Sequence, residues 1–483
     1  MTKLAKTLMK TLTRITAFAL LALSGVYFLR INSPYALRMN SASRLGLFLP
    51  KILAGSLAPF IVLAGAVSGL LAFLLRMPAT GAMAGLATLL AGRYTRRASA
   101  AHEGFDRAFG PGWEQKIPPD VAARLPHSRW QFRLPDTPDP RFSQDVVFWT
   151  VPGPAGAQRQ LLCDIWQPPA GTEPSGLAFI YLHNSFWHFL DKDVGTRPFF
   201  RHLAGQGHVV MDVAYRLCPE VGIREMVGDA RRAIAWMKAH AAEYGVHPER
   251  VVVAGASAGG HLAQLAAYAP DLPELAPADL GDAQMSVRAV VSYYGPTDMR
   301  VWNEYAGPVF GEGYLFGKPS KEEHEEMGVS KDHLTTNLTH PKKSKAWSEY
   351  FYPITFRQIM KNLLGGQPDE VPHMYDLASP VEHVGAHCPP TLFLQGEHDD
   401  FVKATAVRAM ADSLREAGVP AVYVEFPQTE HAFDLFLPRY SPATQAALYD
   451  LDRFLGLMAF KAGEPAHRER PPGSLQPHAA SLE

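Results

Sequence analysis

The sequence has few cysteines, no surplus of charge of either sign and few charged residues overall. Its three cysteines, Cys163, Cys218 and Cys388, are an odd number without C-x-x-C spacing, which excludes a disulfide framework and a structural zinc site as organising principles. The 46 basic and 47 acidic residues leave no basic excess, so nucleic acid is not an expected partner. With 47% hydrophobic residues, the chain is also not intrinsically disordered.

Long uncharged runs are concentrated in the first hundred residues. Residues 52–75 contain no charge over 24 positions, and as a helix they would extend about 36 Å, which is enough to cross a bilayer. Residues 15–29 form a shorter run, and residues 77–92 form a third one with a proline and three glycines. We predict a membrane region over residues 1–98, with two spanning helices and a possible third, re-entrant or interfacial segment at 77–92.

This region admits other interpretations. Basic residues before the first run and small residues near its end also fit a cleaved signal peptide. Residues 52–75 would alternatively be a buried core helix, although such helices usually have about 10–14 residues. Four basic residues precede the first run, four separate the first two and four follow the second, so the positive-inside rule does not give the side of the membrane. We expect an integral membrane protein with an N-terminal anchor in the lipid bilayer.

After a proline-rich stretch at 99–142, which is typical of a linker, strand-like and helix-like segments alternate. Alternation of this kind predicts an α/β fold with a mostly parallel central sheet and helices on both faces. Residues 463–483 are rich in proline and charge and are predicted to be a disordered tail. The first two strands are close enough in sequence to form an antiparallel hairpin. The expected strands are 145–151, 160–166, 178–182, 208–215, 251–254, 287–294, 391–395 and 421–426, and the expected helices 197–205, 221–244, 258–268, 402–417 and 442–462.

One junction between a strand and a helix carries a recognisable motif, Gly255-Ala256-Ser257-Ala258-Gly259. The sequence G-x-S-x-G between a buried strand and a helix is typical of a nucleophile elbow. Small flanking residues leave room for a serine at strained backbone angles, and the helix N-terminus favours a developing negative charge. About 0.15 such pentapeptides would arise by chance in a chain of this composition, so the position of the motif is what makes it informative.

A catalytic serine needs a base and an acid, and in this fold the acid and then the base follow it along the chain. Asp399 follows the strand at 391–395, 142 residues after Ser257, and His431 follows the next strand, 32 residues later. Consecutive parallel strands end at one edge of a sheet, so these side chains can meet there. Asp400 is a competing acid; we favour Asp399 because it follows the turn at Gly396. A solvated histidine and a helix-capping acid are the alternative interpretations.

These residues carry a family resemblance. Residues of about 145–460 resemble the α/β-hydrolase superfamily, specifically its hormone-sensitive-lipase-like and bacterial carboxylesterase group. The similar stretches are Tyr215-Arg216-Leu217-Cys218-Pro219-Glu220, GASAGGHLA around Ser257, Gly396-Glu397-His398-Asp399 and His431-Ala432-Phe433. The resemblance implies an α/β-hydrolase domain at 143–462 in which Ser257, Asp399 and His431 catalyse ester hydrolysis without a cofactor or a metal. Arg216 and Glu220 are expected to support the end of a strand.

The chain departs from the group's pattern at one loop. In place of H-G-G-G after the third strand it has His183-Asn184-Ser185-Phe186-Trp187, so the loop loses the conformational freedom of glycine. The backbone N–H groups of Asn184, Ser185 and Ala258 are the expected oxyanion-hole donors, because a backbone donor depends on side-chain identity only through conformation.

A long insertion at about 298–373 is predicted to form a cap over the serine. Its aromatic residues would line an acyl or alcohol pocket or form the cap's own core, and its charge run at 321–327 fits a solvated helix face. Next to the cap, His383 and His387 have a metal-ligand spacing, but Gly385 and two following prolines disfavour the helix that such a pair needs. No metal site is therefore expected.

Taken together, the sequence predicts a membrane-anchored serine hydrolase that cleaves small-molecule or lipid esters through an acyl-enzyme. An amidase or formamidase with the same triad is one alternative. A catalytically silent, ligand-binding relative is another, made conceivable by the altered loop at Asn184 and Ser185. The sequence does not specify an oligomeric state.

Overall fold

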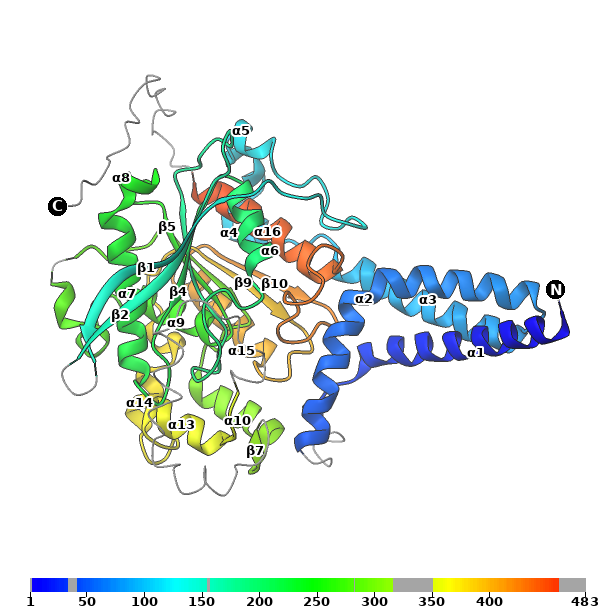
Figure 1. Ribbon diagram of the computed structural model, residues 1–483. Coiled ribbons are helices and arrows are strands. Elements are labelled where there is room, and N and C mark those ends of the chain that lie inside the picture. The colour runs from blue at the N-terminus through cyan, green and yellow to red at the C-terminus, as the bar shows by residue number, and fades with distance from the viewer. Residues whose placement is uncertain (1, 34–40, 154–156, 282, 316–350, 460–483) are drawn as a thin grey trace, which may run out of the picture.

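A computed structural model describes residues 2–33, 41–153, 157–281, 283–315 and 351–459 (Figure 1). The predicted tail at 463–483 and the middle of the predicted cap, including its charge run at 321–327, lie outside the described residues. Figure 1 shows an α/β domain from which long helices of the N-terminal region project to one side.

The described strands of the α/β domain form one sheet in the order β1-β2-β4-β3-β5-β6-β9-β10. The first two strands form the predicted antiparallel hairpin, β2 also pairs antiparallel with β4, and the remaining neighbours are parallel. The predicted mixed but mostly parallel sheet is therefore confirmed. The strands are β1 Arg141–Pro152, β2 Gln158–Gln167, β3 Ala178–Leu182, β4 Val209–Ala214, β5 Val251–Ala256, β6 Ala289–Tyr293, β9 Thr391–Gly396 and β10 Ala421–Phe426.

Helices cover both faces of this sheet, which explains why its strands are continuous apolar runs. Along β5, Val251 and Val253 pack into the core on one face, and Val252 and Ala254 into the core on the other. Helices α7, α9 and α15 cover the first face, and α6 and α16 the second. The bounds are α6 Arg197–Gly205, α7 Ile223–Ala239, α8 Ala241–Tyr244, α9 Ala258–Tyr268, α15 Ala404–Glu416 and α16 Pro442–Met458; the predicted helix at 221–244 is thus divided at His240.

The connecting segments contain short elements. In the predicted linker, Trp113 and Leu125 are buried in the core that includes α16, so this stretch packs on the α/β domain. The described part of the predicted cap consists of helices and a two-stranded sheet. The cap elements are α10 Met299–Phe310, β7 Tyr314–Leu315, β8 Ile354–Thr355, α13 Phe356–Leu364 and α14 Pro372–Leu377. The other short elements are α4 Gly104–Phe109, η3 Trp113–Lys116, α5 Pro119–Ala122, η5 Pro273–Leu275, η6 Ala278–Leu280 and η8 Pro380–His383.

The N-terminal region consists of α1 Lys3–Gly25, η1 Val26–Phe28, α2 Ser41–Leu74 and α3 Pro78–Ala98. The first two helices begin earlier than the uncharged runs suggest. The third segment was expected to be re-entrant or interfacial. It forms one continuous helix, α3, and its placement relative to a bilayer stays a prediction. Its proline is the first helical residue, where a missing N–H removes no hydrogen bond. Among the described residues, Lys3–Phe28 and Gly46–Leu74 are long and apolar enough to cross a membrane.

Large apolar side chains cover the projecting helices, and many of them are exposed. Phe18, Phe73 and Leu89 are 66%, 80% and 70% exposed. The base of the bundle is buried: the rings of Tyr27 and Tyr94 stack at 4.7 Å, and both belong to the core that includes α16. The N-terminal region therefore shares a core with the α/β domain at one end and presents apolar side chains along the rest of its length.

Small residues let α2 and α3 approach each other closely. A Cβ atom added at Gly65 of α2 would lie 2.3 Å from the Thr88 hydroxyl of α3 and 3.2 Å from the Ala84 carbonyl. We predict that Gly65→Leu separates the two helices and costs about 1–3 kcal/mol or more, which would lower the thermal unfolding midpoint of the detergent-solubilised protein. Gly85→Leu on α3 is the matched control, because no atom lies within 4 Å of its added Cβ. Equal effects of the two substitutions would contradict this packing.

Candidate active site

The G-x-S-x-G motif forms a sharp turn between β5 and α9. Ser257 has φ 53° and ψ −119°, a strained conformation for a residue with a side chain. Its N–H donates to the Tyr293 carbonyl of the neighbouring strand at 2.8 Å. Ala258 is the first residue of α9, where a backbone N–H has no acceptor within the helix. The turn thus presents a hydroxyl beside a free helix N-terminus.

The two glycines of the motif are required by close backbone approaches. A Cβ atom at Gly259 would lie 1.9 Å from the Leu182 carbonyl oxygen at the end of β3. One at Gly255 would lie 2.3 Å from the Gly259 carbonyl carbon. Because these contacts are with backbone, a side chain at either position cannot be accommodated by a rotamer change.

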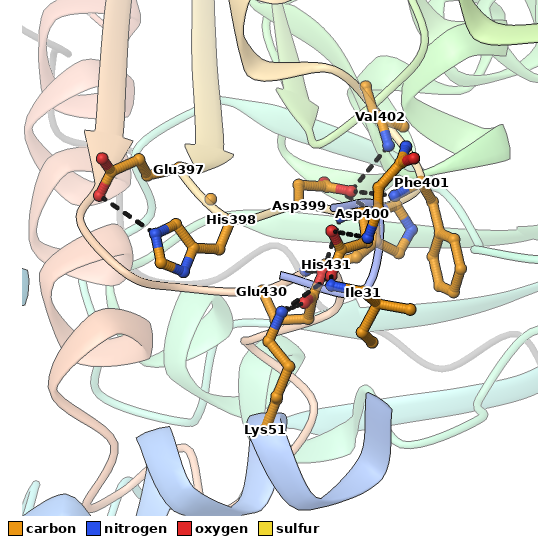
Figure 2. Close-up of polar contacts among 12 residues, drawn as sticks. Ile31, Lys51, Glu397, His398, Asp399, Asp400, Phe401, Val402, Glu430 and His431 are labelled. Atoms are coloured by element: carbon orange, nitrogen blue, oxygen red, sulfur yellow. Dashed lines mark hydrogen bonds and ion pairs between the residues drawn. The ribbon is translucent and has the colours of Figure 1, made fainter. Parts of the chain in front are cut away.

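The structure brings together the three side chains that the sequence singles out. The Ser257 Oγ lies 3.0 Å from His431 Nε2, and His431 Nδ1 lies 2.8 Å from an Asp399 carboxylate oxygen. Asp399 follows β9, and His431 follows β10, its parallel neighbour, so both loops leave the same edge of the sheet. The Asp399 and His431 side chains are 0% and 6% exposed, and Figure 2 shows the two residues side by side.

Asp399 is held rigidly, and Asp400 points elsewhere. Asp399 accepts hydrogen bonds from the backbone N–H groups of Phe401 and Val402 at 2.9 and 2.7 Å, and from the Gln395 side chain at 2.9 Å. The next helix, α15, begins at Ala404, so neither acid caps it. The Asp400 carboxylate instead accepts from backbone N–H groups of the N-terminal region. Asp399 is therefore the acid in contact with His431.

Aromatic rings surround the imidazole of His431. The ring of Tyr294 lies 4.4 Å from it and that of Phe401 5.3 Å, measured between centroids. Phe310 of α10 stacks on Phe401 at 5.2 Å and thereby brings the cap next to the site. The Tyr294 hydroxyl donates to the Asp434 carboxylate, whose pKa is raised chiefly by burial. Buried aromatic rings therefore pack around the imidazole of His431.

The loop that replaces the glycine-rich pattern adopts left-handed conformations at two aromatic residues. Phe186 and Trp187 have φ values of 48° and 60°, which cost about 1–3 kcal/mol each for residues other than glycine. Ser185 stabilises this shape: its hydroxyl lies 2.6 Å from the Tyr215 hydroxyl and accepts from the Trp187 N–H at 2.9 Å. Tyr215 in turn donates to the His183 carbonyl at 2.7 Å. Side-chain hydrogen bonds thus support the strained backbone.

The indole of Trp187 completes this support. Its N–H donates to Nδ1 of His261 at 3.2 Å, while Nε2 of His261 lies 2.6 Å from the Ala378 carbonyl. This pattern requires a neutral imidazole protonated at Nε2, and burial lowers the pKa of His261 to about 4. The indole also packs edge-on against Trp302 of the cap at 5.1 Å. The loop is therefore tied to both α9 and α10.

The described aromatic residues of the cap pack on the α/β domain. Phe356 contacts both Trp302 and Phe310, and all three are buried in the core that includes α9. Phe310 also reaches Phe401 beside His431. The predicted cap residues at 316, 347 and 350 lie outside the described residues.

Two sequence features away from the serine have structural contacts. Arg216 makes a two-pronged ion pair with Asp229 at 2.8 Å, and Glu220 pairs with Arg159 at 2.9 Å. His383 and His387 each lie within hydrogen-bond distance of a backbone carbonyl, at 2.9 and 2.7 Å. These contacts indicate that the four residues stabilise the fold.

Several residues at the site carry no signal in the sequence. Gln395 and Tyr305 hold Asp399 through its carboxylate and its backbone carbonyl, both at 2.9 Å. Lys51 of α2 forms ion pairs with Asp400 and Glu430, which adjoin Asp399 and His431 in sequence. From the sequence, a lysine at the start of an uncharged run would be expected to contact lipid headgroups. The structure instead places Lys51 beside two buried acids.

Comparisons with known proteins agree with this architecture. The BD-FAE family model matches residues 163–332 and 335–414, which is just over half of the chain. A probable carboxylic ester hydrolase of Mycobacterium tuberculosis, LipM, is 30% identical over 278 residues, covering 56% of this chain and 53% of LipM. Esterase LipQ of the same organism is 27% identical over 363 residues, covering 74% of each chain. This chain thus spans about half the length of LipM.

Solved structures were also compared. A thermophilic esterase of the planctomycete Thermogutta terrifontis is 23% identical, with a TM-score of 0.47, and the match covers 71% of this chain and 99% of the esterase.

The sheet order, the serine turn and the residues that follow β9 and β10 define an α/β-hydrolase. By its matched residues, the chain belongs to the BD-FAE family.

We predict that the elbow does not tolerate a methyl group. Gly259→Ala forces α9 away from β3 and should destabilise the protein by more than about 3 kcal/mol, measured as a loss of folded protein or a lowered unfolding midpoint. The control is Gly222→Ala, whose added Cβ lies 3.4 Å from the nearest atom and which we expect to cost less than about 1 kcal/mol. A fully stable Gly259→Ala protein would show that the turn is looser than described.

Proposed function

We propose that the protein is a membrane-anchored serine hydrolase of carboxylic esters, with Ser257 as nucleophile, His431 as general base and acid, and Asp399 as the group that orients the imidazole. The observation that supports this most directly is the continuous hydrogen-bonded chain from Ser257 Oγ through both nitrogens of His431 to Asp399. The names of the relatives, a carboxylic ester hydrolase and an esterase, support the ester as substrate class.

In the proposed reaction, Ser257 Oγ attacks the ester carbonyl carbon while His431 Nε2 takes the hydroxyl proton. The tetrahedral intermediate collapses as the bond between the carbonyl carbon and the alcohol oxygen breaks, and His431 returns the proton to the departing alcohol. Water then attacks the acyl-enzyme by the same route, which releases the acid and restores the serine. Asp399 keeps the proton on Nδ1 and stabilises the imidazolium while it exists.

The oxyanion of both tetrahedral intermediates would be bound by backbone N–H groups of Asn184, Ser185 and Ala258. Ala258 supports this role through its position at the N-terminus of α9. For Asn184 and Ser185, the support is the fixed loop shape that the Ser185 hydroxyl and Tyr215 maintain. The loop thus contains no glycine, and hydrogen bonds hold its backbone in the shape that the proposed oxyanion hole needs.

The substrate proposed is an apolar ester that partitions into a membrane. Phe186, Phe310 and Phe401 contact one another beside His431. Phe186, the one of the three that is partly exposed, offers apolar surface to an acyl or alcohol group. The exposed apolar side chains of the N-terminal helices support insertion of that region into a bilayer, since a buried core helix would cover them. Ser24 of α1 and Tyr27 of η1 pack on α3, through the Ala87 carbonyl and the Tyr94 ring, and these contacts support retention of α1 in the mature protein.

We predict that Ser257→Ala abolishes labelling by a fluorophosphonate probe and lowers kcat for a soluble p-nitrophenyl ester at least about 10³-fold. The reason is that the variant has no oxygen nucleophile for either reagent. Exposed Ser143 of β1 provides the matched control, and Ser143→Ala should react like the unchanged protein.

The alternatives give different results in the same assays. A silent ligand-binding relative would show no serine adduct in the unchanged protein. An amidase would cleave the amide that corresponds to the test ester at a comparable rate, whereas the proposed esterase strongly prefers the ester.

We predict that the full-length protein stays with membranes after alkaline carbonate washing and is released only by detergent, because its N-terminal helices insert into the hydrocarbon region. Its mass after release should include residues 2–25, since α1 is part of the packed bundle. Release by carbonate would contradict the anchor, and loss of about two dozen N-terminal residues would indicate a cleaved signal peptide.

A further inference from the structure

The first half of α2 lies along the α/β domain, and one charged residue of this helix points into it. Lys51 follows Pro50, and its side chain is 3% exposed. Figure 2 shows the lysine extending from the helix toward the loops that carry Asp399 and His431. The position is unusual, because a lysine beside a long apolar run normally extends into water or lipid headgroups.

Lys51 Nζ contacts two buried carboxylates. It lies 2.8 Å from Asp400 and also pairs with Glu430, and both acidic side chains are 2% exposed. Asp400 further accepts from the backbone N–H groups of Ile31 and Asn32 at 2.8 and 2.9 Å. Two separate segments of the N-terminal region therefore bind the loop that follows β9.

Glu430 joins that loop to the loop that follows β10. The carboxylate oxygen that faces away from Lys51 accepts from the Asp400 N–H at 2.8 Å and from the His431 N–H at 3.0 Å. Asp399 and His431 are the immediate neighbours of the two acids. One lysine thus contacts both carboxylates, and one carboxylate contacts the backbone of both loops.

This arrangement depends on the positive charge of Lys51. Burial, and then the negative charge of Asp400, raises the pKa of Glu430 well above its usual range. Removing one partner from a buried group of charges leaves the others uncompensated, which is strongly destabilising to their local arrangement. Lys51 lowers the pKa of Glu430, so without Lys51 this acid would take up a proton, Asp400 would lose its buried partner charge, and the loops beside them would shift.

We propose that Lys51 is a positioning residue for catalysis: through Asp400 and Glu430 it holds the loops of Asp399 and His431 at their working separation. The membrane region is thereby part of the active-site scaffold as well as an anchor. This inference rests on the proposed esterase function. Displacement of a catalytic group by about 1 Å can reduce a rate about 100-fold, so a small shift of either loop is sufficient.

The test compares full-length variants in detergent, with active sites counted by stoichiometric fluorophosphonate labelling. Lys51→Met keeps the length of the side chain and removes its charge. We expect kcat per labelled site, for a soluble short-chain p-nitrophenyl ester, to fall about 10- to 100-fold, with KM changed less than about threefold. A residue that only stabilises the fold would lower the number of active sites and leave kcat per site unchanged.

Two further variants serve as controls. Lys51→Arg keeps the charge in a differently shaped group, and its kcat per site should lie between those of the unchanged protein and Lys51→Met. Arg30→Met removes an exposed ion pair across the same interface, 3.8 Å from Glu397. Exposed pairs of this kind contribute little, and the loss of this one should leave kcat unchanged.

If Lys51→Met does not fold, Glu430→Gln tests the same link: the amide oxygen can still accept from the Asp400 and His431 N–H groups, while an NH2 group replaces the oxygen that pairs with Lys51. A fall in kcat per site of at least about threefold is then expected. Unchanged kcat per site in Lys51→Met, or in Glu430→Gln where that variant is needed, overturns the positioning role while leaving the esterase intact. An unchanged protein that takes no label overturns the proposed function itself.

Discussion

The whole site depends on the parallel register of the sheet. Strands β5, β9 and β10 run in the same direction, so the segments that follow them emerge at one edge. Ser257, Asp399 and His431 are far apart in the chain, yet each follows the carboxyl end of a buried parallel strand. The close approach of Gly259 to Leu182 at the neighbouring strand end shows how tightly this edge is packed.

The strand ends place the site residues only approximately. Hydrogen bonds to fixed partners then set the orientation of each side chain. The Asp399 carboxylate accepts hydrogen bonds from two backbone N–H groups and one side-chain amide, and these bonds fix its orientation toward His431. The loop at Ser185 is likewise fixed by hydrogen bonds, here those of a side-chain hydroxyl. The loop contains two aromatic residues at strained backbone angles and stabilises them with a hydroxyl and an indole N–H.

The N-terminal helices add a constraint from outside the α/β domain. Their exposed apolar faces suit a bilayer, while their base shares a core with α16 and contributes Lys51 to a buried ionic cluster. A bilayer anchor attached in this way has a defined orientation relative to the active site, because a rigid core and not a flexible linker joins the two.

The fold class and the residues of the proposed triad were accessible from sequence because each has a local signature. Continuous apolar strands mark a sheet covered on both faces, and a serine between glycines at a strand-to-helix junction marks the elbow. Asp399 and His431 follow from their order and from strand ends. The full extent of α3 was not predicted, since residues 77–92 contain a proline and three glycines and were treated as a possible segment, whereas the proline begins a continuous helix.

Only the tertiary structure decided which of two adjacent acids contacts the histidine, how the altered loop keeps its shape, and where Lys51 points. These features depend on contacts between residues that are distant in the sequence, from 30 positions for Ser185 and Tyr215 to 379 for Lys51 and Glu430. No local pattern encodes such a pair, because the energy of a buried charge is set by the groups around it in space. The sequence determined the chemistry that is present, and the packing determined which groups act on one another.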